Sequence, residues 1–131
     1  MTIRQINFPL SLKCLFFCIY TGYNGGIFQV DQIGYLDTKH TSSHPGLVRK
    51  FSKIKSAFGI DWAKTSWSDL RKPLYSAIAA RLVLANKSPP IPSSLSGQAK
   101  YWKQYYNSGL GKGTEQKFIN DWNAYLKSTQ G

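Results

Sequence analysis

Acidic side chains are scarce in this sequence, which has six Asp and Glu against seventeen Lys and Arg and a formal net charge of +11 over 131 residues. None of the six lies between residues 1 and 30. Such a charge attracts polyanions such as nucleic acid, anionic lipid or bacterial envelope polymers, and added salt weakens the attraction. Composition alone does not choose among these partners, and binding to nucleic acid would be non-specific.

Cysteine is scarce as well, and common catalytic motifs are missing. Cys14 and Cys18 are four residues apart, and one helical turn is a poor frame for a disulfide between them. No Cys or His partner stands at metal-ligand spacing, so we expect no metal and no cofactor. The absence of a Gly-x-Ser-x-Gly or His-Glu-x-x-His motif leaves serine-hydrolase and zinc-peptidase chemistry without support.

No apolar run approaches the ~20 residues that span a bilayer, so we expect no membrane span. Residues 1–21 nevertheless differ from the rest, because Arg4 and Lys13 precede an uncharged stretch at 14–20. Three interpretations stay open: a secretory signal, a buried first strand or helix, or a start that is not native to this fold. We therefore divide the chain into an apolar segment at 1–21 and one domain at 22–131, and expect a secreted monomer.

Helical periodicity dominates the domain. Apolar residues at 47, 51, 54 and 58 predict a helix that Gly59 caps, with Arg49, Lys50, Lys53 and Lys55 on its other side. The basic side is either a polyanion-binding surface or an ordinary solvated face.

Three further helices are predicted. Pro73 suits the first turn of an alanine-rich helix that continues over 74–85 and is central to the core. The proline-containing stretch 86–96 is expected to be a loop, and 97–107 to be a helix. Thr114 is expected to cap the last helix.

The stretch 22–31 contains the candidate site. Gly25 and Gly26 allow a tight reversal, and the β-favouring residues at 27–30 predict a short strand that directs Gln29 and Asp31 to one side. Residues 32–37 are expected to continue as strand or turn. The predicted fold class is mainly α (α+β), with a small β-hairpin. An ordinary hairpin with a solvated Asp31 is the alternative.

The segment Gly26-Ile27-Phe28-Gln29-Val30-Asp31 resembles the Gly-hydrophobic-hydrophobic-Gln-Val-Asp segment of goose-type lysozymes and related lytic transglycosylases. Two later stretches agree with that family in order. Residues 69–82 are similar to its Pro-led, Ala-rich cleft helix, and Gln98–Gln104 resembles its Ala-Gln-Tyr-Tyr-Lys-Gln run. The resemblance implies a lysozyme-like helical domain at 22–131 that is directed at bacterial peptidoglycan.

The resemblance also implies roles for individual residues. Asp31 matches the catalytic position that orients water, and Gln29 matches a cleft residue that hydrogen-bonds an N-acetyl group. The residues expected to contact substrate beside Gln29 are aromatic: Tyr23, Phe28, Tyr75 and Trp102.

One departure from the family puts catalysis in doubt, since the glutamate that acts as acid lies upstream of this segment in the family and has no counterpart here. Three explanations stay open: glycan binding without cleavage, a truncated or replaced N-terminal part, or different chemistry by Asp31 and Asp37. His40 and His44 are expected to be exposed loop residues. The alternatives to a muramidase are a non-catalytic basic protein that binds glycan or nucleic acid, and a membrane-active or antimicrobial protein.

Overall fold

The computed structural model describes residues 24–107 and 113–130. Contacts divide the chain into two compact units, whose described parts are 24–86 in the first and 87–107 with 113–130 in the second. The segment at 1–21, both cysteines and Tyr23 lie outside the described residues. The assignment of 22–131 to one domain stays a prediction.

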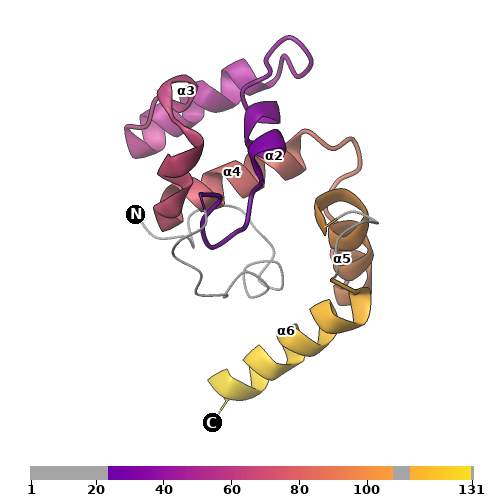
Figure 1. Cartoon of the computed structure of the whole chain (residues 1–131). Coiled ribbons are helices and arrows are strands. Elements are labelled where there is room, and N and C mark those ends of the chain that lie inside the picture. The colour runs from indigo at the N-terminus through magenta and orange to yellow at the C-terminus, as the bar shows by residue number, and fades with distance from the viewer. Residues whose placement is uncertain (1–23, 108–112, 131) are drawn as a thin grey trace. The chain divides into compact units, whose positions relative to one another are not determined.

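The first unit is built from short and medium helices (Figure 1). In chain order they are α2 (Gln32–Asp37), α3 (Leu47–Phe58), the 3-10 turns η2 (Trp62–Lys64) and η3 (Trp67–Arg71), and α4 (Pro73–Ala85). Helix α4 contacts both α2 and η3, and α3 contacts η2. The mainly α class predicted from the sequence is confirmed.

The predicted β-hairpin is wrong for the described residues, which contain no strand. Residues 24–29 form turns, and 32–37 form helix α2 instead of continuing as strand. The physical reason is Asp31, whose Oδ1 accepts a hydrogen bond from the Gly34 backbone N–H at 2.6 Å. That bond caps a helix, and it outweighs the β preference of the preceding residues.

Helices α3 and α4 follow their sequence signals closely. Gly59 caps α3 with a φ of 71°, and its N–H donates to the Lys55 carbonyl. Pro73 is the first residue of α4. Residues 76–80 of that helix are buried on consecutive positions, so α4 is covered nearly all round, as expected of a central helix.

A chain of hydrogen bonds satisfies the polar groups around α2. The Trp62 indole N–H donates to Thr38 Oγ1 at 3.0 Å, and the Thr38 hydroxyl donates to the Tyr35 carbonyl at 2.6 Å. The Tyr35 ring meets the Trp62 ring edge to face, with centroids 6.1 Å apart. These groups are buried, so leaving one unpaired would cost about 1–3 kcal/mol.

The second unit contains α5 (Leu95–Trp102), a π-helical turn η4 (Lys103–Asn107) and α6 (Glu115–Thr129). Ser94 caps α5, so this helix begins two residues before the predicted start at Gly97. Thr114 caps α6 as predicted, since its hydroxyl accepts from the Lys117 N–H at 3.0 Å. The core of this unit includes Trp102 and Phe118, whose ring centroids lie 5.5 Å apart.

The length and polarity of a helix decide whether it could cross a membrane. Within 24–107 and 113–130, no helix has both the length and the apolar character needed to cross a bilayer. The expectation of no membrane span is consistent with this finding.

Gly26→Ala is expected to destabilise the first unit by at least about 2 kcal/mol. Gly26 has a φ of 70°, and an added Cβ would overlap the backbone oxygen of Leu70. Gly59 has a φ of 71° and nothing within 4 Å of an added Cβ, so Gly59→Ala should cost only about 1–2 kcal/mol from backbone strain. Urea unfolding of both variants checks the difference, and equal losses would contradict the contact with Leu70.

Candidate functional site

Two nested backbone hydrogen bonds shape the stretch that contains Gln29. The Gln29 N–H donates to the Gly26 carbonyl at 2.9 Å, and the Val30 N–H donates to the Gly25 carbonyl at 3.4 Å. Gln29 has a φ of 53°, and it is the one non-glycine residue with positive φ in the part of the chain that the structure describes. Left-handed backbone costs an ordinary residue roughly 1–2 kcal/mol, so surrounding contacts must hold it.

Ser76 of α4 supplies those contacts. Its Oγ accepts from the Phe28 backbone N–H at 3.0 Å and donates to the Gly25 carbonyl at 2.8 Å. Ser76 is fully buried among the alanines of α4. A single hydroxyl therefore satisfies two backbone groups of the turn and fixes the turn against the central helix.

Gln29 and Asp31 are the predicted site residues that are neighbours along the chain. Both are exposed, and they lie two residues apart between the turns and the start of α2. The Trp67 indole N–H donates to the Val30 carbonyl at 2.9 Å, which adds a second support between them. The amide of Gln29 offers a donor and an acceptor, and the carboxylate of Asp31 accepts only.

Three of the other predicted substrate contacts are described by the structure, and none of them is an exposed side chain. Phe28 is 1% exposed and belongs to the core. Tyr75 is half-buried, and the Lys72 ammonium lies 4.7 Å from its ring centroid. Trp102 is 6% exposed and belongs to the second unit, where it packs on Phe118. Phe28 and Trp102 therefore have evident roles in packing.

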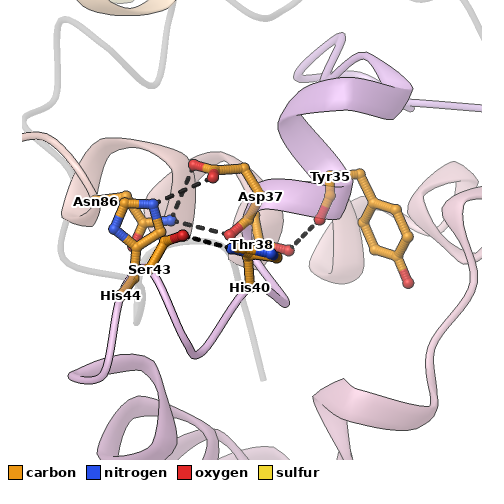
Figure 2. Close-up of polar contacts among 7 residues, drawn as sticks. All are labelled: Tyr35, Asp37, Thr38, His40, Ser43, His44 and Asn86. Atoms are coloured by element: carbon orange, nitrogen blue, oxygen red, sulfur yellow. Dashed lines mark hydrogen bonds and ion pairs between the residues drawn. The ribbon is translucent and has the colours of Figure 1, made fainter.

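A polar cluster that sequence reasoning missed surrounds Asp37 at the end of α2 (Figure 2). The Asp37 carboxylate contacts His44 Nε2 at 3.1 Å and accepts from Asn86 Nδ2 at 3.3 Å. The same amide nitrogen donates to the Asp37 carbonyl at 3.2 Å. His44 was expected to be an exposed loop residue, but it is half-buried because this pairing draws it toward α2.

The second histidine has a different partner. His40 is exposed, as expected, and its Nδ1 lies 2.6 Å from the Ser43 hydroxyl (Figure 2). The Asp37 carboxylate contacts His44 instead, so these side chains do not form one serine–histidine–aspartate series. The contacts hold the loop 38–46, and Asp37 is already engaged as an acceptor.

The chemistry that the exposed Gln29 amide and Asp31 carboxylate offer is hydrogen bonding. Among the described residues, no group of three or more His, Cys, Asp or Glu side chains could hold a metal ion. Asn86 was the signal for the missed cluster: a polar amide directly after a buried helix often caps it or binds across a loop. Its partner, Asp37, lies 49 residues earlier, so spacing could not identify the pair.

No protein-family model, curated protein or solved structure matches this chain. Its function is therefore inferred from the residues and their geometry.

Ser76→Ala is expected to lower the free energy of unfolding by about 1–3 kcal/mol, because the turn would lose both buried hydrogen bonds to the Ser76 hydroxyl, and the Gly25 carbonyl would keep the longer bond from the Val30 N–H. Ser56→Ala is the matched control, since Ser56 is exposed on α3 and alanine is the better helix former. Chemical denaturation of both variants makes the comparison. A Ser76→Ala protein as stable as Ser56→Ala would show that the turn is held by other contacts.

Proposed function

We propose that this chain is a lysozyme-like protein that binds the N-acetylated glycan of bacterial peptidoglycan through Gln29 and Asp31, and that it does so without cleaving the glycosidic bond. The observation that carries the proposal is the strained backbone of Gln29, whose φ is 53°. Strain of this kind persists where surrounding structure enforces it, and it concentrates at functional positions.

The exposed amide and carboxylate match the chemistry of an N-acetylated sugar. An acetamido group presents one N–H and one carbonyl, which the two halves of the Gln29 amide can pair with. Sugar hydroxyls donate to a carboxylate such as that of Asp31, and a hydrogen bond to a charged group contributes about 1.5–3 kcal/mol. Two such groups on a fixed turn favour binding, because little backbone freedom remains to be lost.

We expect binding without cleavage because neither Asp31 nor Asp37 is suited to act as the acid. Glycosidic cleavage uses a protonated carboxyl group as acid and a second carboxylate as base or nucleophile. Asp31 resembles the family's water-orienting position, but its carboxylate already accepts from the Gly34 N–H as the cap of α2, which does not favour a role as acid. Asp37 already accepts from Asn86 and contacts His44, which does not favour a role as acid.

Gln29→Gly is expected to weaken binding to purified peptidoglycan about tenfold without lowering stability. Glycine removes the amide and also relieves the positive φ, so the two effects separate function from folding. Asp31→Asn is expected to weaken binding similarly, because asparagine keeps the cap of α2 but loses the charge. Sedimentation of the protein with peptidoglycan stripped of phosphate polymers measures the affinity.

Asp61→Asn is the matched control for charge, since Asp61 lies in the same unit and only pairs with Lys64 at 3.9 Å. It should bind as the wild type does. Unchanged binding by both Gln29→Gly and Asp31→Asn would refute the proposed contact. Release of reducing ends by the wild type, abolished in Asp31→Asn, would instead make the protein a muramidase and overturn the non-catalytic proposal.

A further inference from the structure

Helix α3 presents a basic face formed by three of its four basic residues. Arg49, Lys50 and Lys53 fall within an arc of about 100° at 3.6 residues per turn, and all three are exposed. Lys55 is exposed on the other flank. The buried side chains of α3 lie on the remaining side, at Leu47 and Ile54.

These four charges are not neutralised by the protein. Helix α3 contains no acidic residue. The side chains of its four basic residues form no hydrogen bond or ion pair in the described part of the chain. The ion pairs there lie elsewhere, at Asp37–His44, Asp61–Lys64, Asp69–Lys72 and Asp121–Lys117. An uncompensated face of this kind attracts a partner that carries repeated negative charge.

The other exposed residues of α3 indicate which classes of partner the face could bind. Its exposed neutral side chains include Ser52 and Ser56, and it has no aromatic ring or amide for stacking on or reading bases. Phe51 and Phe58 are half-buried on the opposite side. Val48 is the one exposed large apolar side chain of α3, which is too little to embed the helix in a bilayer. Recognition would therefore depend on the negative charge of the partner.

The dimensions of the face suit a linear chain. Arg49 and Lys53 are four positions apart on this face, which corresponds to about 6 Å along the helix axis. Adjacent phosphates of a flexible phosphodiester chain can therefore contact separate cations of the face. Each contact releases a condensed counterion, which favours binding at low salt.

We propose that the basic face of α3 binds a poly(glycerol phosphate) chain of the bacterial envelope. The choice of an envelope polymer over DNA rests on the proposed function at Gln29 and Asp31. The phosphate polymer would hold the protein at the cell wall while the turn contacts glycan.

The test compares two double variants that remove the same charge. Arg49→Gln/Lys53→Gln removes two cations from α3, and Lys100→Gln/Lys127→Gln removes two exposed cations from the second unit. Fluorescence anisotropy with labelled poly(glycerol phosphate), repeated over a range of salt concentrations, gives the affinity and its salt dependence. Circular dichroism establishes that both variants are folded.

The α3 variant is expected to lose on the order of tenfold in affinity at low salt, and the slope of log K against log salt should fall by about one unit or more. The control should stay close to the wild type. Equal losses in both variants would overturn a local site in favour of net charge. Tighter, α3-dependent binding to duplex DNA of matched phosphate number would overturn the envelope polymer and assign nucleic acid.

Binding to phosphate-free peptidoglycan separates the two proposals. If both hold, the α3 variant keeps this binding while Asp31→Asn loses it. The anisotropy measurement contains no peptidoglycan, so failure of the glycan contact would leave its outcome unchanged. Loss of phosphate-free peptidoglycan binding in the α3 variant would show that the basic face contacts glycan directly, and would overturn the proposal.

Discussion

The buried hydroxyl of Ser76 is the contact on which the arrangement of the first unit depends. It accepts from the Phe28 N–H and donates to the Gly25 carbonyl, so one atom determines where the turn meets α4. Gly26 lies in the same place, and its missing side chain lets the turn approach the Leu70 carbonyl. The strained Gln29 follows from this anchoring, because a backbone fixed on both sides cannot relax to a more favourable φ.

Helix α4 organises both ends of α2, although α2 has only six residues and would not be stable alone. Before α2, Ser76 in the first half of α4 holds the turn. After α2, Asn86 at the C-terminal cap of α4 binds the carbonyl and the carboxylate of Asp37. The small side chains of α4 allow this close packing. The candidate site and the polar cluster are thus two consequences of the same central helix.

Local signals in the sequence predict most of the helices. Gly59, Pro73 and Thr114 each act on backbone groups within one turn, and each predicted end is found. The prediction for the stretch 32–37 was wrong because the Asp31 carboxylate was interpreted as a catalytic or a solvated group, whereas it caps α2. Contacts between distant residues, such as Asp37 with Asn86, could not be predicted, since the place of Asn86 after a buried helix does not identify a partner 49 residues away.

The two proposed surfaces have complementary physical roles. An exposed carboxylate such as that of Asp31 is repelled by an anionic cell wall, so a glycan contact through Gln29 and Asp31 would be disfavoured at long range. The uncompensated cations of α3, within a chain of net charge +11, reverse that repulsion over roughly a Debye length, about 8–10 Å at moderate salt. Charge on α3 would then favour encounter with the wall, while the fixed amide and carboxylate discriminate among sugars at hydrogen-bonding distance. Salt screens the long-range attraction of the α3 cations more than it weakens the short-range hydrogen bonds of Gln29 and Asp31. High salt should therefore impair arrival at the wall before it impairs recognition of the glycan.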